Sequence, residues 1–147
     1  MVSLDNDHRR RADITQNILT WDYKNAFSPG FFDIPCTEYS SAKTVGHRRL
    51  DYADRIVEKT LEIIQFFDPP IWWIENPRLG LLKDREIMRG IPYIDVDYCK
   101  FENWGYKKPT RIWVCEQLAK LPKHYVQAIH AQIIMKMGIN IGCILGV

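Results

Sequence analysis

Three short segments of this 147-residue chain place a reactive or polar side chain directly after an apolar run. The first contains Cys36 in Pro-Cys-Thr-Glu-Tyr-Ser, the second contains Glu75 in Glu-Asn-Pro, and the third is a basic segment that ends at Arg111. Open α/β sheets place their ligand sites beyond the ends of their strands, so these positions predict a site. A cysteine thiolate is a nucleophile, a carboxyl group can hold or transfer a proton, and a guanidinium binds anions.

Each of these residues also has a structural interpretation when it is taken alone. A lone cysteine such as Cys36 is typical of a buried, small apolar side chain. Glu75 in the loop after a strand is typical of a side chain that satisfies backbone N–H groups, and Arg111 is typical of a surface cation. The order and spacing of the segments are therefore needed to choose between the two interpretations.

The hydrophobic pattern predicts an α/β arrangement of the elements that position these groups. Apolar residues between positions 50 and 67 recur with helical spacing, and Asp68-Pro69-Pro70 ends the helix. The continuous apolar run at 71–74 predicts a central parallel strand that is buried on both faces. The remaining predicted elements are short strands at 2–4, within 12–19 and at 31–34, strands at 93–98 and 111–115, and a helix at 125–137.

Composition indicates one soluble domain that spans residues 1–147. The chain is 46% apolar and 26% charged, and its net charge of +2 neither demands nor excludes a polyanionic partner. The four cysteines are widely separated and form no Cys-x-x-Cys pair, which predicts a reducing, intracellular setting and no metal site. No leader-like segment opens the chain, and no apolar run approaches the roughly 18 residues of a membrane span. We therefore expect no membrane association.

The order of the segments resembles that of the DNA (cytosine-5) methyltransferases from Val2 to about Val114. An acidic residue after the first strand, the Pro-Cys segment, Glu-Asn-Pro about forty residues later and a Gly-Tyr-basic-Pro-Thr-Arg segment follow one another as in that family. The resemblance implies an incomplete Rossmann-like sheet of the S-adenosylmethionine-dependent methyltransferase type, with flanking helices. It also implies that the Cys36 thiolate attacks C6 of a flipped-out cytosine, while Glu75 binds the N3 edge of the base and helps to protonate it.

The resemblance further implies a cofactor site and a surface for DNA. Asp5 corresponds to the acid that holds the ribose of S-adenosylmethionine, and the adenine-binding position falls at either Asp13 or Asn17. Arg111 is the one residue retained from the family's Gln-x-Arg-x-Arg segment, and we expect it to be part of the catalytic site. The candidates for DNA contacts are Arg9, Arg10, Arg11, Lys43, His47, Arg48, Arg49, Trp104 and Tyr106, although three adjacent arginines are also typical of a solvated loop.

The sequence departs from the family pattern in three places. The first 29 residues contain no glycine-rich Phe-x-Gly-x-Gly loop, and glycine is what allows backbone to approach a charged cofactor closely. Phe32-Asp33-Ile34 leads directly into Pro35-Cys36, and so short a strand would displace the thiol. The 33 residues after Val114 are fewer than the family's target-recognition region and closing helix require. We therefore expect a truncated methyltransferase-like domain that is impaired or inactive on its own.

Two functional hypotheses follow from these features. In the first, the chain is a methyltransferase-like fragment that a second chain completes and that uses S-adenosylmethionine if it is active. In the second, it is a pseudoenzyme without cofactor, a structural or interaction subunit of a larger assembly such as a virus particle. Both predict a protein partner over Val2–Leu4 and the apolar residues 138–147, with DNA as a further candidate partner, in the cytoplasm or nucleus or within a virion. The near-neutral charge disfavours a plain DNA-binding module.

Overall fold

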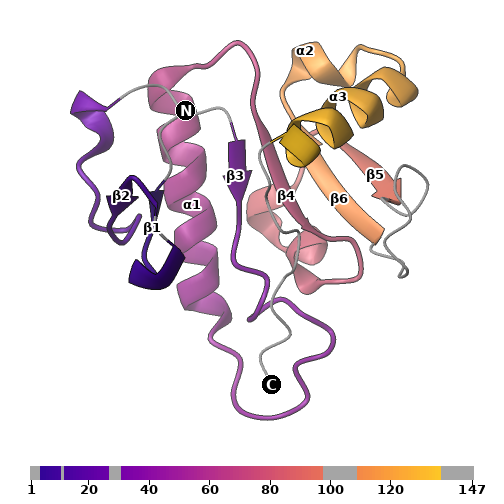
Figure 1. Ribbon diagram of the computed structural model, residues 1–147. Helices are drawn as coiled ribbons and strands as arrows, with labels where there is room; N and C mark the ends of the chain where they lie inside the picture. The colour runs from indigo at the N-terminus through magenta and orange to yellow at the C-terminus, as the bar shows by residue number, and fades with distance from the viewer. Residues whose placement is uncertain (1–3, 11, 27–30, 98–108, 137–147) are drawn as a thin grey trace.

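The computed structural model describes residues 4–10, 12–26, 31–97 and 109–136, and these ranges form helices and two small sheets (Figure 1). The larger sheet has the order β3-β4-β6-β5. Its strands are β3 (Phe31–Asp33), β4 (Trp73–Pro77), β5 (Tyr93–Asp97) and β6 (Pro109–Val114). The helices are α1 (Leu50–Phe67), α2 (Glu116–Ala119) and α3 (Lys123–Lys136). The expected mixture of helices and strands is therefore confirmed.

The four-stranded sheet is mixed rather than all parallel. β3 and β4 are parallel, with Asp33 opposite Glu75, whereas β6 is antiparallel to both β4 and β5. Since β6 reverses direction between its two neighbours, β3, β4 and β5 all run the same way. The Rossmann-like arrangement implied by the family resemblance is thus matched only in part by the described strands.

The first strands of the chain form a separate two-stranded sheet. β1 (Leu4–Asp5) pairs in parallel with β2 (Ile14–Thr15), while residues 18–20 form a turn. The side-chain oxygen of Asn17 accepts the N–H of Leu19 at 2.9 Å in that turn. An asparagine that hydrogen-bonds the backbone two residues ahead favours a turn over an extended strand. The predicted strand within 12–19 is therefore limited to Ile14 and Thr15, and Val2 and Ser3 lie outside the described residues.

Helix α1 has the predicted bounds, because its sequence carries one apolar face and a strong stop signal. The buried side chains of that face include Ala53, Val57, Ile63 and Ile64, and they pack in one core with Ile74 and Trp113 of the sheet. The helix ends where Asp68 adopts a left-handed conformation with φ of 43° and donates its N–H to Ile64. Pro69 and Pro70 follow at once and cannot continue a helix.

The central strand β4 begins two residues later than the apolar run predicts. Ile71 is exposed, whereas Glu75 and Asn76 are buried within the strand and pair with β6. The Glu-Asn-Pro motif therefore belongs to the strand itself and does not form the loop after it. The interior position predicted for this strand is confirmed, since β4 lies between β3 and β6, but β4 is parallel to β3 alone and antiparallel to β6.

The remaining elements follow their predicted patterns closely. β5 alternates buried and more exposed side chains, and α3 begins two residues earlier than expected. A second core on the other sheet face joins the strands to Leu118 of α2 and Val126 of α3. The predicted burial of residues 138–147 lies outside the described residues. Short 3-10 helices occupy His8–Arg10, Tyr23–Asn25, Leu81–Asp84 and Glu86–Met88.

None of the helices in the described ranges combines the length and the apolar character needed to cross a membrane.

Candidate functional site

The parallel pairing of β3 and β4 brings the Pro-Cys loop, defined here as residues 34–49, to the strand that carries Glu75. Cys36 follows β3 after two residues, and Glu75 lies opposite Asp33 in β4. The side-chain amide of Asn76 donates a hydrogen bond to the carbonyl oxygen of Ile34 at 2.9 Å. Because Asn76 is 1% exposed, this bond forms inside the protein, where it joins the two motifs directly.

The close approach of backbone around Asn76 depends on Gly80. A Cβ atom at position 80 would lie 3.1 Å from the carbonyl oxygen of Pro77 and 3.2 Å from that of Tyr39. Among the described residues, the carboxamide oxygen of Asn76 has no hydrogen-bond partner, and it lies 3.5 Å from the same Cβ position. A side chain at position 80 would therefore require these carbonyl oxygens to shift by a few tenths of an ångström.

Cys36 is buried, and its sulfur is disulfide-bonded. Its carbonyl oxygen accepts the N–H of Tyr39 at 3.0 Å, which closes a tight turn immediately after Pro35-Cys36. A disulfide sulfur is not a thiolate, so nucleophilic chemistry at Cys36 requires prior reduction. Cys115, in contrast, is a free and buried cysteine at the start of α2.

The Pro-Cys loop is ordered by two of its own basic residues. Arg48 donates to the carbonyl oxygens of Glu38 at 2.9 Å, Ser40 at 2.7 Å and Lys43 at 2.8 Å. The Glu38 carboxylate accepts hydrogen bonds from the Lys43 ammonium at 2.6 Å and from the backbone N–H of Arg49 at 2.8 Å. The Lys43 hydrogen bond and the Arg49 N–H lower the pKa of Glu38.

These contacts divide the basic candidates for DNA binding into two groups. Lys43 and Arg48 are partly buried and hold the loop, whereas His47 and Arg49 are exposed. Arg9 is also exposed and pairs with Asp7 at 2.9 Å. Trp104, Tyr106 and Arg11 lie outside the described residues, as does the side chain of Arg10.

Arg111 is held by neighbours on its own face of the sheet. Its guanidinium donates two hydrogen bonds to Asp95, at 2.8 and 3.0 Å, and stacks 3.7 Å from the centre of the Tyr93 ring. The Asp95 hydrogen bonds raise the pKa of Arg111. In the β4–β6 register Arg111 is opposite Asn76, while Glu75 is opposite Ile112. Successive strand residues point to opposite faces, so Arg111 and Glu75 project from opposite faces of the sheet.

The candidate cofactor residues all lie on or beside the two-stranded sheet. Asp5 is at the carboxyl end of β1, where its carboxylate accepts the N–H of Asp7 at 2.8 Å. Asp13 is exposed and directly precedes β2, and Asn17 follows β2 by two residues. Asp5, Asp13 and Asn17 therefore lie in one small region, which contains β1, β2 and their connections.

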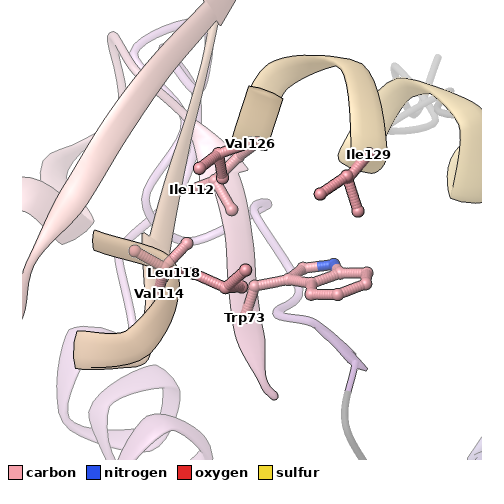
Figure 2. A pocket seen from close by; sticks show the side chains of 6 residues that line it. All are labelled: Trp73, Ile112, Val114, Leu118, Val126 and Ile129. Atoms are coloured by element: carbon pink, nitrogen blue, oxygen red, sulfur yellow. The ribbon is translucent and has the colours of Figure 1, made fainter. Parts of the chain in front are cut away.

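An apolar pocket lies under α2 and α3 (Figure 2). Trp73 lines it, and since alternate residues of a strand share a face, Glu75 projects from the same sheet face. Apart from the indole N–H of Trp73, its lining consists of hydrocarbon groups. Such a lining cannot orient a nucleobase or a charged cofactor by hydrogen bonds, so this pocket is not the candidate site. The residues that line it are Trp73, Ile112, Val114, Leu118, Val126 and Ile129.

Sequence reasoning did not identify the residues that hold the Pro-Cys loop. Tyr39, Asp54 and Arg85 form a hydrogen-bonded group from three separate segments, and no spacing rule connects positions so far apart. Asn76 was recognised only as part of the Glu-Asn-Pro motif. In the described part of the chain no group of His, Cys, Asp or Glu side chains is arranged to hold a metal ion.

The Pro-Cys loop and the adjoining Glu-Asn-Pro strand carry the motifs whose order resembles that of the cytosine-5 methyltransferases. An alignment of 119 positions, covering 69% of this chain, gives 30% identity to the probable DNA (cytosine-5)-methyltransferase of Frog virus 3 (isolate Goorha). The chain is therefore related to DNA (cytosine-5) methyltransferases, as its motif order predicted. It covers 55% of the length of that relative. No family model and no solved structure matches the chain.

Proposed function

We propose that this chain binds a DNA cytosine between Cys36 and Glu75 and activates its C5 position, as the first half of cytosine-5 methylation. The observation that carries the proposal is the hydrogen bond from Asn76 to Ile34, because it couples the strand of Glu75 to the loop of Cys36. The viral relative supports the same reaction class. A single methyltransferase-like domain over residues 1–147, with a Rossmann-like sheet, is part of this proposal and is supported by the common direction of β3, β4 and β5.

The proposed chemistry starts from the reduced thiol of Cys36. Its thiolate adds to C6 of the cytosine while Glu75 donates a proton to N3, which leaves an enamine with a nucleophilic C5. C5 then takes a proton from water, loses its original proton, and the base expels the thiolate as N3 returns its proton. The net result is exchange of the C5 hydrogen with solvent, and this exchange consumes no co-reactant. When bound, S-adenosylmethionine would supply a methyl group to the same carbon.

The residues present fit only one end of that cofactor. Asp5 can accept hydrogen bonds from ribose hydroxyls. Asp13, which directly precedes β2, and Asn17, which follows it by two residues, are the two candidate partners for the adenine amino group. The described residues offer no glycine-rich backbone for the methionine carboxylate. We therefore propose that the 147 residues alone do not transfer a methyl group.

Release of tritium from duplex DNA that contains 5-tritiated cytosine tests this function. The protein is first reduced with dithiothreitol and is assayed without S-adenosylmethionine. We expect tritium release that Cys36→Ser and Glu75→Gln abolish. Cys115→Ser is the matched control, since it removes a buried thiol at a distance from the loop and should retain the activity.

A second candidate function is that of a non-catalytic interaction subunit of a larger assembly, such as a virus particle. The disulfide at Cys36 favours it, because the nucleophile that the reaction needs is occupied. In that case a protein partner over the chain ends replaces DNA as the main ligand. Absence of tritium release from fully reduced and folded protein, on every DNA substrate tested, would select this function over the enzymatic one.

A further inference from the structure

Tyr39 of the Pro-Cys loop is anchored by both its side chain and its backbone. Its side chain is fully buried, and its hydroxyl donates to the Asp54 carboxylate of α1 at 2.9 Å. Arg85 lies in the segment after β4, and its Nε–H donates hydrogen bonds to both carboxylate oxygens of Asp54, at 3.1 and 3.0 Å. Its Nη2 also donates a hydrogen bond to Oδ2 of Asp54. One carboxylate thus joins the loop, the long helix and the segment that follows Glu75.

Both backbone polar groups of Tyr39 form hydrogen bonds. Its N–H donates to the carbonyl oxygen of Cys36 at 3.0 Å, and its carbonyl oxygen accepts a hydrogen bond from the N–H of Leu81 at 2.8 Å. Leu81 lies only a few residues after the Glu-Asn-Pro strand, at the start of a 3-10 helix. Tyr39 therefore determines how the turn of Cys36 lies relative to both α1 and the end of β4.

The ionisation behaviour of Tyr39 is suited to a constant hydrogen-bond donor. Burial, followed by the hydrogen bond to Asp54, raises the pKa of the phenol strongly. The hydroxyl consequently keeps its proton at every pH at which a nucleophilic thiolate would operate. The phenol therefore remains a hydrogen-bond donor over that range.

We propose that Tyr39 is a positioning residue for Cys36, which acts through its hydrogen bond to the Asp54–Arg85 pair. The kinetic test of this inference rests on the proposed function, because it measures C5 hydrogen exchange. The chemical test measures the reactivity of the Cys36 thiol and does not rest on that function. Small displacements of a reacting group are costly, since an error near 1 Å can lower a rate about a hundredfold. Removing the hydroxyl should therefore slow C5 hydrogen exchange while leaving DNA binding intact.

The kinetic test compares Tyr39→Phe with Tyr23→Phe in the tritium-release assay. Tyr23 is the matched control, because it is also a buried tyrosine whose hydroxyl donates to a carboxylate, that of Glu62 at 2.5 Å. For Tyr39→Phe we expect kcat to fall about 10- to 100-fold with KM for DNA within about twofold. Tyr23→Phe should retain both constants, once the rates are normalised to folded protein. Equal losses in the two variants, or an unchanged kcat in Tyr39→Phe, would overturn the proposal.

A double substitution tests the route through Asp54. In an Asp54→Ala background, adding Tyr39→Phe should lower kcat by less than about twofold, because the partner of the hydroxyl is already absent. A further loss as large as that of Tyr39→Phe alone would show that the hydroxyl acts by another path.

The chemical test does not depend on DNA or on methyltransferase activity. Reduced, folded protein is treated with iodoacetamide, and alkylation of the Cys36 peptide is followed by mass spectrometry. Cys36 is 6% exposed, so its alkylation requires the loop to move. We expect alkylation to be about fivefold or more faster in Tyr39→Phe and unchanged in Tyr23→Phe. If the wild-type protein shows no tritium release, the proposed function fails, and an unchanged alkylation rate in Tyr39→Phe then separately refutes the positioning role.

Discussion

The side-chain amide of Asn76 lies 2.9 Å from the carbonyl oxygen of Ile34, two residues before Cys36. This bond crosses from β4 to the chain that leaves β3, where the backbone ladder of the parallel pair has ended at Asp33 and Glu75. The first residues of the Pro-Cys loop are thus bound to the sheet by a side chain rather than by strand pairing.

Asn76→Ala should destabilise the fold and eliminate C5 hydrogen exchange. The substitution leaves a buried carbonyl without its donor and creates a small cavity, so we expect a loss of about 2 kcal/mol in the free energy of unfolding. Urea denaturation followed by circular dichroism measures this loss. Asn25→Ala, at an exposed asparagine, should change stability by less than about 0.5 kcal/mol. Similar effects of both substitutions would show that the Ile34 contact contributes nothing.

Arg48→Lys should loosen the Pro-Cys loop without unfolding the protein. A lysine ammonium cannot reproduce the planar, three-carbonyl contact that the guanidinium makes with Glu38, Ser40 and Lys43. We expect amide hydrogen exchange over residues 38–48 to become about tenfold faster, with α1 unaffected. Arg49→Lys is the control, because the Arg49 side chain is 70% exposed and makes two long contacts, at 4.0 Å to Glu38 and 5.2 Å to the centre of the Tyr52 ring.

The stability of the Pro-Cys loop should decrease in acid because of Glu38. Its pKa in the folded protein is lowered from an ordinary value of 4.5, first by Lys43 and then by the Arg49 N–H. A carboxyl group with a lowered folded pKa stabilises the fold above its unfolded pKa, and this contribution disappears as the pH falls through the folded pKa. Loop hydrogen exchange, compared at pH 6 and near pH 3, should accelerate less in Glu38→Gln than in wild type. Glu58→Gln, at an exposed glutamate on α1, should behave like wild type.

The isolated chain should not bind S-adenosylmethionine with micromolar affinity. One hydrogen-bonded hydroxyl contributes about 0.5–1.5 kcal/mol, whereas micromolar binding corresponds to about 8 kcal/mol. Titration calorimetry with the purified chain measures this directly. A saturable micromolar heat that Asp5→Ala removes and Asn6→Ala retains would instead establish a functional cofactor site.

The sequence determined the elements better than it determined the contacts between them. Residues 50–67 were predictable because an apolar helical face and the Asp-Pro-Pro stop both act locally. The position of β4 was shifted, because the burial of Glu75 and Asn76 depends on pairing with β6, which lies far away in the sequence. The turn at 18–20 was misread in part because the hydrogen bond of Asn17 outweighs the β propensity of its apolar neighbours.

In the candidate site too, the sequence predicted the elements better than the contacts between them. The sequence placed Cys36 and Glu75 directly after two apolar runs, and those runs form the neighbouring parallel strands β3 and β4, but the catalytic roles of both residues remain predictions. Lys43 and Arg48 were grouped with possible DNA contacts because composition reveals charge and not hydrogen-bond geometry. Tyr39 received no role, since its importance comes from Asp54 and Arg85, and no sequence periodicity brings those residues together.

The order of strands in the larger sheet has a consequence for synthesis on the ribosome. β5 emerges before β6, yet within the described sheet β6 is its only neighbour. β6 also pairs with the edge of β4 that faces away from β3. A nascent chain that has exposed β5 alone offers it no strand partner, so the sheet can close only after residue 114 has left the exit tunnel. Until then β5 and the edge of β4 that faces away from β3 present unpaired backbone, a condition that invites association with other chains. A pause in translation shortly after β6 would favour productive folding, whereas a pause between β5 and β6 would expose one edge of β4 and an unpaired β5 to chaperones or to aggregation.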